Sequence, residues 1–274
     1  MKRIPLARVI GLGILSVGAL IMIFPTLWML LISLHEYPER YRTLIELIVQ
    51  PWTLRNYTDT LTTDNFGRYF ANSLLVASSV TIANVISCFL VAYGLARKTV
   101  RGKSLLVGSV IGMLALPPHV LMIPLYRMMS TFGWINSYAA LIVPWCVTPF
   151  GIFFLYQYLQ SLPTSLEDAA RLDGASERII LVRVVAPIAR PALTVLAIYT
   201  FLANWNSFLF PFLLTNDETH RTLPVALAFY IGKQSIDWGH IMAGASLAAL
   251  PVIVIFVLFQ RTIITALTAG ALKG

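Results

Sequence analysis

The sequence predicts an all-α, polytopic membrane protein with six transmembrane helices and one long polar loop between the fourth and fifth of them. Hydrophobic residues make up 58% of the 274 residues and charged residues only 12%, against about a quarter in soluble domains. The hydrophobic residues also form uncharged blocks, and several are long enough for the roughly 20 residues of helix that cross a bilayer. We therefore expect a single transmembrane domain over residues 1–274.

The first predicted span covers residues 9–34 and follows a short basic tail that contains Lys2, Arg3 and Arg8. A cleaved signal peptide is the alternative for an apolar block near the N-terminus. However, the block is too long for that, and the sequence around Pro25 lacks the small-residue pattern of a cleavage site. An uncleaved anchor is the favoured interpretation.

Five further spans are predicted, and all six lack Asp, Glu, Lys and Arg. Their ranges are 70–96, 104–126, 139–158, 191–214 and 241–259. Pro117, Pro118 and Pro124 interrupt the third span, whereas no matching break is predicted in the second half of the chain. Pro191 enters the fifth span at a first-turn position, where its missing N–H has no helical partner to lose.

The distribution of charge predicts the orientation. With six spans, one side holds both termini, the short connection at residues 97–103 and the polar loop at 161–190. That side carries 13 of the 20 Lys and Arg residues but only 4 of the 12 acidic residues. The positive-inside rule therefore places both termini and the polar loop in the cytoplasm.

The polar loop has the local signals of two short helices joined by a turn. Ser165 is expected to cap the first helix with Asp168 as its capping-box partner, and Glu167 also falls in the first turn, where the helix dipole favours anions. Asp173-Gly174 is expected to end this helix, because glycine readily adopts the left-handed conformation. From these signals alone, an ordinary amphipathic loop explains the segment as well as a docking platform does.

The loop resembles the EAA loop of ABC-importer permeases. The resemblance rests on Asp168-Ala169-Ala170, on Asp173-Gly174 and on Val185-Ala186-Pro187. Asp replaces the usual Glu of the motif, with Glu167 directly before it, and Val-Ala-Pro replaces Ile-x-Leu-Pro. In that family the loop is a coupling helix that docks on a separate ATPase subunit. The resemblance therefore implies a docking role for Glu167, Asp168, Ala169, Ala170, Asp173, Gly174 and Pro187.

Two other stretches are similar to the carbohydrate-importing, maltose-type branch of these permeases. They are residues 203–208 with the following Pro211, and the C-terminal region from Asp237 to Gly274. The resemblance covers all six spans and is closest from Ser161 onward. It implies a bacterial or archaeal plasma (inner) membrane protein that works with a second, homologous permease as a heterodimer, two ATPase subunits and an extracytoplasmic solute-binding protein. ATP and magnesium would be bound by the ATPase subunits, and this chain would bind no cofactor.

No enzymatic chemistry is predicted for the chain itself. A phosphate-binding loop is absent from the sequence, and so are a catalytic residue constellation and a metal-ligand spacing. Cys88 and Cys146 both lie in apolar blocks, and the isolated His119 is expected to make a helix-packing contact. Nucleic acid is not an expected partner, because the basic residues behind the net charge of +8 are scattered through short loops.

Uncharged polar residues within the spans have two interpretations. One is hydrogen bonding between helices, worth about 0.6 kcal/mol per bond on average. The other is a pathway lining in which amides bind sugar hydroxyls and an aromatic ring stacks on a sugar face. The candidates for that lining are Asn84, Asn204, Trp205, Asn206 and Tyr126.

The sequence is also compatible with other functions. An amino sugar or a glycerophosphodiester is an alternative cargo, although a phosphate would favour a cluster of Arg or Lys that the spans do not contain. A secondary transporter or a membrane scaffold is less favoured. Ion-coupled transporters usually keep ionisable residues within the membrane, and the predicted spans have none.

Overall fold

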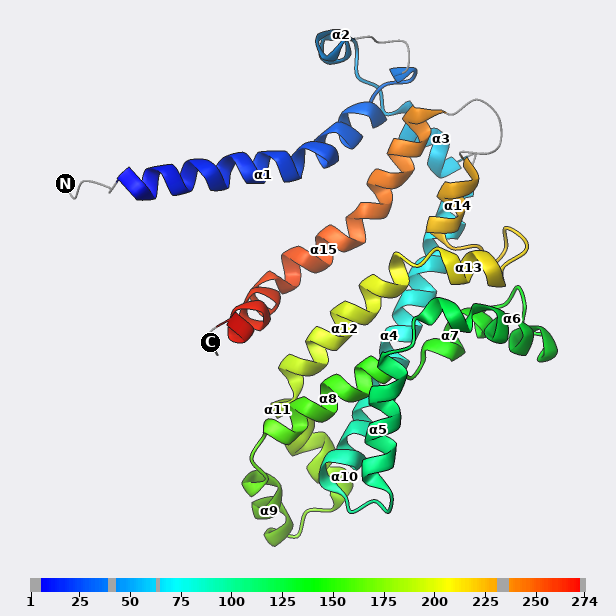
Figure 1. Ribbon diagram of the computed structural model, residues 1–274. Coiled ribbons are helices and arrows are strands. Elements are labelled where there is room, and N and C mark those ends of the chain that lie inside the picture. Colours follow the sequence, from blue (N-terminus) through cyan, green and yellow to red (C-terminus); the bar gives the residue numbers. More distant parts are fainter. Residues whose placement is uncertain (1–5, 39–42, 63–64, 231–236, 272–274) are drawn as a thin grey trace. The chain divides into compact units, whose positions relative to one another are not determined.

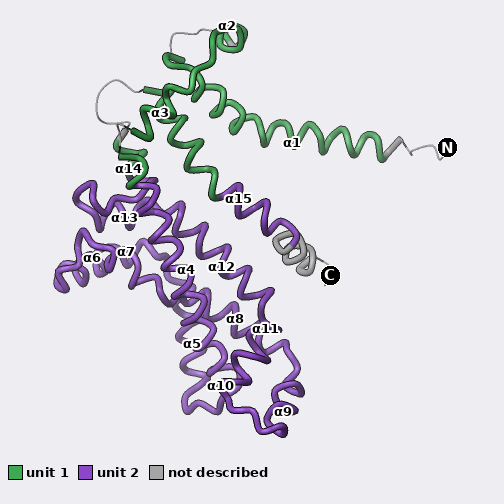
Figure 2. The backbone as a smooth tube through the Cα atoms, turned by 180° about the vertical axis from the view of Figure 1, so that it is seen from behind, with its two compact units in different colours: residues 1–68, 226–251 green, residues 69–225, 252–274 purple. Residues whose placement is uncertain are grey.

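The structure is a computed structural model that describes residues 6–38, 43–62, 65–230 and 237–271 (Figure 1). None of these residues forms a β-strand. Most of the basic N-terminal tail and the last three residues of the chain lie outside the described residues. The chain divides into two compact units, which Figure 2 colours separately: residues 1–68 with 226–251, and residues 69–225 with 252–274.

The first unit consists of helices and the loops that join them. Its helices are α1 (Leu6–Ser33), α2 (Leu44–Val49), α3 (Arg55–Thr62), most of α14 (Leu223–Tyr230) and the first part of α15 (Trp238–Ala271). The 28 residues of α1 correspond to about 42 Å of helix, which is more than the hydrocarbon thickness of a bilayer.

A buried amide organises the junction of α1 and α3. The side chain of Asn56 donates hydrogen bonds to the carbonyl oxygens of Ser33 (2.9 Å) and His35 (2.7 Å), just after α1 ends. Gly239 of α15 lies against the same group, so that a Cβ there would come within 2.5 Å of Asn56 Nδ2. Glycine is therefore needed at this position for α15 to approach the junction.

The second unit holds the remaining elements, and α4 runs through it. In chain order they are α4 (Phe66–Arg97), α5 (Lys103–Leu114), η2 (Pro118–Leu121), α6 (Met122–Thr131), α7 (Tyr138–Ile142), η3 (Val143–Trp145), α8 (Pro149–Ser161), α9 (Ser165–Leu172), α10 (Glu177–Ile179), η4 (Ile180–Val185), α11 (Ala186–Ile188), α12 (Arg190–Trp205) and α13 (Leu209–Leu214), followed by the first residues of α14 and, later, the last part of α15.

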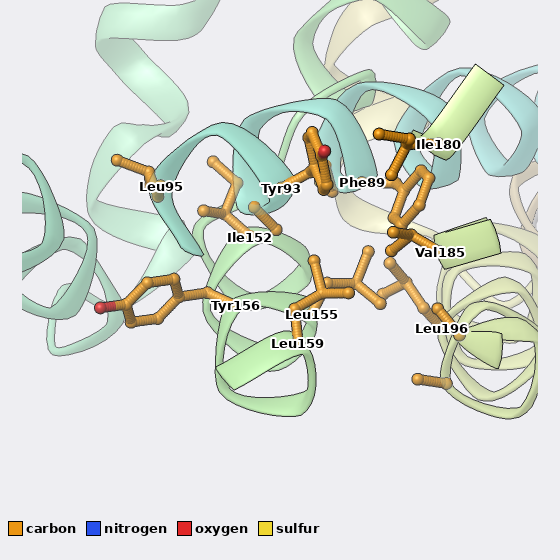
Figure 3. Close-up of a cluster of buried hydrophobic side chains, with 14 residues drawn as sticks. Phe89, Tyr93, Leu95, Ile152, Leu155, Tyr156, Leu159, Ile180, Val185 and Leu196 are labelled. Atoms are coloured by element: carbon orange, nitrogen blue, oxygen red, sulfur yellow. The ribbon is translucent and has the colours of Figure 1, made fainter. Parts of the chain in front are cut away.

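A cluster of buried hydrophobic side chains joins four parts of this unit (Figure 3). Phe89 and Tyr93 come from α4, and Leu155 from α8. Val185 comes from the segment that precedes α12, and Leu196 from α12 itself. Partly buried residues of α9 and α5 pack on the same cluster, so the polar loop and the helices around it share one core.

Four helical segments are long and apolar enough to cross a membrane: Arg8–Ser33, Phe66–Arg97, Tyr138–Ser161 and Trp238–Arg261. Two bent helix pairs also meet the same criteria when each is taken together. Lys103–Leu114 meets Pro118–Thr131 at 97°, and Glu177–Ile188 meets Arg190–Trp205 at 75°. By length and composition, the described residues therefore contain four candidate spans, or six if each bent pair counts as one.

The second half of the chain contains a helix break that the sequence analysis did not predict. The stretch 191–214 is helical only to Trp205 and resumes at Leu209. The Asn206 side chain donates to the carbonyl oxygen of Leu202 at 2.9 Å, while Pro211 lacks an N–H and its ring would clash with the carbonyl of Ser207 in a continuous helix. The expectation of an unbroken fifth span was wrong for this reason.

Candidate functional site

The loop that resembles an EAA loop, residues 161–190, is hereafter the platform. Its first helix, α9, begins at Ser165, but the predicted capping box is wrong. Thr164 is the cap residue, and its carbonyl oxygen accepts from the backbone N–H groups of Glu167 (2.9 Å) and Asp168 (3.0 Å). The Asp168 carboxylate instead contacts Arg171 Nη1, at 2.8 Å. It therefore does not cap the N-terminus of the helix.

Gly174 ends α9 as the sequence predicts. Its φ is +80°, and the two hydrogen bonds of a Schellman motif close the helix there: Gly174 N–H to Arg171 O (3.1 Å) and Ala175 N–H to Ala170 O (2.9 Å). A Cβ at Gly174 would meet no atom within 4 Å. The requirement for glycine is therefore one of backbone conformation and not of space.

A buried ion pair attaches α9 to the end of α4. Arg97 Nε donates to Glu167 Oε1 at 2.6 Å, and Arg97 Nη2 donates to the carbonyl oxygen of Leu162 at 3.0 Å. Both side chains are more than nine-tenths buried. Within the described part of the chain, Glu167 Oε2 accepts no hydrogen bond and lies 3.7 Å from Arg171 Nη2. Glu167 therefore faces the interior of the unit, and not a surface on which a partner could dock.

A second, more exposed charge cluster lies beside this pair. The carboxylate of Glu177 contacts Lys98 Nζ at 2.6 Å and Arg171 Nε at 3.1 Å, and it accepts from the Tyr93 hydroxyl at 3.2 Å. The hydrogen bonds from Lys98 and Arg171 lower the pKa of Glu177 to about 2. The bond to Glu177 in turn raises the pKa of Arg171. Together with Arg97–Glu167, these contacts connect both helices of the platform to the end of α4.

The outward face of α9 is apolar and bordered by acidic side chains. Leu166 is 53% exposed and Leu172 is 89% exposed, and Ala169 between them is also exposed. This spacing of three residues places the three side chains on one helical face. Asp168 and Asp173 are exposed beside them, whereas Ala170 packs against the core.

Pro187 lies away from α9, in the turn that leads to α12. The helix widens into a π-helical segment, η4, immediately before it, and Pro187 itself is exposed in α11. Proline cannot donate to the carbonyl four residues earlier and would clash with it, and a widened turn is a common way of accommodating that defect. Pro187 thus shapes the 75° bend that follows.

Asn84, a candidate for the pathway lining, is used in helix packing. It is fully buried, and its amide donates to the carbonyl oxygen of Trp145 (2.9 Å) and to Thr148 Oγ1 (3.2 Å). Its carbonyl oxygen accepts from Thr200 Oγ1 at 3.5 Å. Here the amide of Asn84 joins three segments of the unit, as the helix-packing interpretation expects, and its role as a pathway residue stays a prediction.

The other four candidates differ in their exposure. Trp205 is only 3% exposed and packs between Phe70 and Phe201, so it offers no free ring face. Asn204 is half-buried, and its amide donates to its own helix, to Thr200 O at 2.8 Å. Asn206 and Tyr126 are exposed and remain accessible to a solute.

Several residues of the site were missed by the sequence analysis. Arg97 and Lys98 were interpreted only as orientation signals, and Glu177 was not considered. Arg97 and Glu167 are 70 positions apart, and nothing in the local sequence signals their pairing. Among the described residues no group of three or more His, Cys, Asp or Glu side chains could hold a metal ion.

Comparisons with known proteins identify the family of the chain. Residues 89–268 match the family described as the binding-protein-dependent transport system inner membrane component. The chain is 35% identical, over 95% of its length and 96% of the relative, to the trehalose/maltose transport system permease protein MalG of Thermococcus litoralis. It is 33% identical, over 93% of both chains, to the arabinooligosaccharides transport system permease protein AraQ of Halalkalibacterium halodurans.

A solved structure shares the fold. It is a bacterial ABC transporter involved in the import of the acidic polysaccharide alginate, and it matches with a TM-score of 0.82 at 20% identity, covering 95% of this chain and 99% of the other. The family match and the two permease relatives show that the chain belongs to the inner-membrane permease components of binding-protein-dependent ABC transport systems.

Proposed function

We propose that this permease forms half of a translocation pathway for a neutral sugar or a related polyol. The observation that carries the proposal is the platform: an apolar, acid-bordered helix face that is exposed, on a helix bonded to the end of α4. The named cargoes of the two relatives, trehalose/maltose and arabinooligosaccharides, support a carbohydrate. The absence of charged residues from the predicted spans favours a neutral one.

The same proposal includes the partners. A second, related permease completes the pathway, two ATPase subunits bind the platforms, and an extracytoplasmic solute-binding protein delivers the sugar. The distribution of Lys and Arg supports a cytoplasmic location of the platform and of both termini. Leu166, Ala169 and Leu172 would fill an apolar groove on the ATPase, and Asp168 and Asp173 would pair with basic groups at its edge. Glu167 and Arg97 would transmit the movement of α9 to α4.

Co-purification from native membranes tests the assembly. The chain is extracted in a mild detergent, and the proteins that accompany it are identified by mass spectrometry. Recovery of an ATPase with a nucleotide-binding domain and of a second permease is the expected result. A chain that is recovered alone, and that moves solute in vesicles without ATP, would instead be a secondary transporter.

Uptake by the reconstituted assembly tests the cargo. Proteoliposomes that contain the purified complex and its binding protein are supplied with trehalose, maltose, arabinotriose, an amino-sugar disaccharide and a glycerophosphodiester. ATP-dependent uptake of one or more of the neutral sugars is expected. Preferential uptake of the amino sugar or of the phosphodiester would replace the neutral-sugar assignment while leaving the importer itself in place.

A further inference from the structure

Two helix breaks lie within the predicted third and fifth spans. α5 ends at Leu114 and helical turns resume only at Pro118, while α12 ends at Trp205 and α13 begins at Leu209. At membrane depth, non-helical backbone is tolerated only where protein buries it or where it lines a water-filled cavity. Each break therefore needs a polar or proteinaceous surrounding.

The two breaks meet through a stack of rings. His119, in the turn after the first break, stacks on Phe210 from the second, with centroids 6.4 Å apart and planes at 20°. Phe210 in turn contacts Trp145 edge-on, with centroids 4.7 Å apart. We call these three residues the aromatic ledge. Within the ledge, Phe210 is buried, Trp145 is half-buried and His119 is exposed.

Helix lengths favour a position of the ledge within the membrane, although the chain turns by 97° at the first break. The 12 residues of α5 rise about 18 Å from Lys103 to the first break, and the 16 residues of α12 rise about 24 Å from Arg190 to the second. Asn84, which binds the carbonyl of Trp145, lies about 20 Å along α4 from Arg97. These three distances from charged helix ends agree on a level well within a hydrocarbon core of about 30 Å.

The exposed groups at this level are unsuited to lipid. The His119 imidazole is exposed at the first break and the Asn206 side chain at the second. Polar and ionisable side chains at membrane depth are costly against hydrocarbon, and they normally face a bundle interior or an aqueous cavity. The broken backbone and the exposed side chains therefore both favour an aqueous cavity or a protein interior, and not lipid, around the ledge.

We propose that the aromatic ledge is a substrate-contact site of the translocation pathway, and that His119 is its contact residue. This inference rests on the proposed function. The outer face of the imidazole would stack on the C–H face of a sugar ring while its nitrogens bond to sugar hydroxyls, and Asn206 would supply an amide from the second break. Phe210 is a positioning residue, because its ring supports the imidazole from behind. No Lys, Arg, Asp or Glu lies in the predicted spans, so the ledge suits a neutral polyhydroxy ligand.

Water accessibility tests the location. A His119→Cys variant is assembled into the full complex, and the complex is treated with a charged, membrane-impermeant methanethiosulfonate reagent. Labelling above that of the parent protein is expected, since Cys88 is buried and Cys146 half-buried. Ile21→Cys is the matched control, because Ile21 is exposed in the uncharged part of helix α1 and is expected to stay unlabelled. Reaction of His119→Cys with lipid-soluble N-ethylmaleimide alone would overturn the proposal.

Protection and kinetics test the contact. The sugar with the fastest ATP-dependent uptake, supplied with its binding protein, is expected to slow the labelling of His119→Cys. His119→Leu is expected to raise the apparent KM for that sugar roughly tenfold, the size of one lost hydrogen bond, and His119→Gln by less. Labelling that the sugar does not slow, or equal KM values for the Leu and Gln variants, would show that the ledge lines a water-filled passage without contacting the substrate. ATP-dependent uptake by the parent complex would leave the proposed function standing in either case.

Discussion

Arg97 Nε and Glu167 Oε1 lie 2.6 Å apart, and both side chains are almost completely buried. The first residue ends α4, and the second lies in the first turn of α9. Because Arg97 also binds the Leu162 carbonyl, it holds the loop before α9 as well as the helix. A displacement of α9 by a bound ATPase would therefore reach α4 through this pair, since neither charge can leave its partner without a large desolvation cost.

Removing one member of this pair should destabilise the unit. Arg97→Met leaves the Glu167 carboxylate buried without a cation, and breaking a buried pair in this way costs about 3–5 kcal/mol. The thermal unfolding midpoint of the purified complex is expected to fall clearly. The double variant Arg97→Met/Glu167→Leu should recover much of that stability, because it leaves no buried charge. Equal midpoints for the parent and Arg97→Met would show that the pair contributes nothing.

A β-branched residue at Gly174 should uncouple transport. Gly174→Val must place valine at φ near +80°, which costs at least about 1–2 kcal/mol and would distort the end of α9. Uptake and transport-linked ATP hydrolysis are expected to be lost, while the amount of chain inserted in the membrane stays unchanged. Gly174→Asn is the control, because Asn tolerates the left-handed conformation. Normal uptake by the valine variant would remove the platform from the mechanism.

The exposed face of α9 should be needed for ATPase binding. Leu172 is the most exposed residue of that face, and Leu172→Asp would put a charge into the proposed apolar groove. The yield of ATPase that co-purifies with the permease is expected to drop at least tenfold, which corresponds to about 1.4 kcal/mol of binding free energy. Ile45→Asp changes a similarly exposed residue of α2 and should leave the yield unchanged. An unchanged yield with Leu172→Asp would place the ATPase elsewhere.

Much of the fold could be predicted because it depends on local signals. Uncharged blocks of sufficient length predicted helices, and the observed α1, α4 and α15 include the expected ranges 9–34, 70–96 and 241–259 to within one residue. Gly174 and Pro191 were interpreted correctly, since their backbone preferences act at their own positions. The break after Trp205 was missed because it depends on a proline that lies six residues later in an apolar run.

The site was less predictable because its residues meet through tertiary contacts. Asn84 and Trp205 have suitable chemistry for a sugar, but neighbouring helices bury both of them. Glu167 and Asp168 are adjacent in sequence, yet one is buried against Arg97 and the other is exposed. Composition and spacing cannot distinguish the two faces of α9, because that distinction depends on where α4 ends.

Acid should weaken the platform through Glu177. Its pKa is lowered from about 4.5 to about 2 by Lys98 and Arg171, so its ionised form stabilises the folded state. That contribution is complete above the unfolded pKa and is lost as the pH falls from about 4.5 toward 2. Thermal midpoints of the parent and of Glu177→Gln are therefore expected to differ at pH 6, to differ less at pH 3 and to converge only as the pH approaches 2. A difference that does not change with pH would exclude this charge as the cause.

The contact between α4 and α8 should depend on the size of the residue at position 151. A Cβ on Gly151 would lie 2.7 Å from Cys88 Sγ and 3.1 Å from Asn84 Oδ1, so Gly151→Ala forces the two helices apart or displaces the buried amide. Overpacking of this kind costs about 1–3 kcal/mol, and the thermal midpoint of the complex should fall accordingly. Gly151→Ala/Cys88→Ala removes the closest clashing atom and should recover part of the loss, whereas Gly108→Ala, at a position with open space, should have little effect. If the double variant is no more stable than Gly151→Ala alone, the contact with the Cys88 sulfur is not the source of the strain. The loss of stability would then come from displacement of the Asn84 hydrogen bonds.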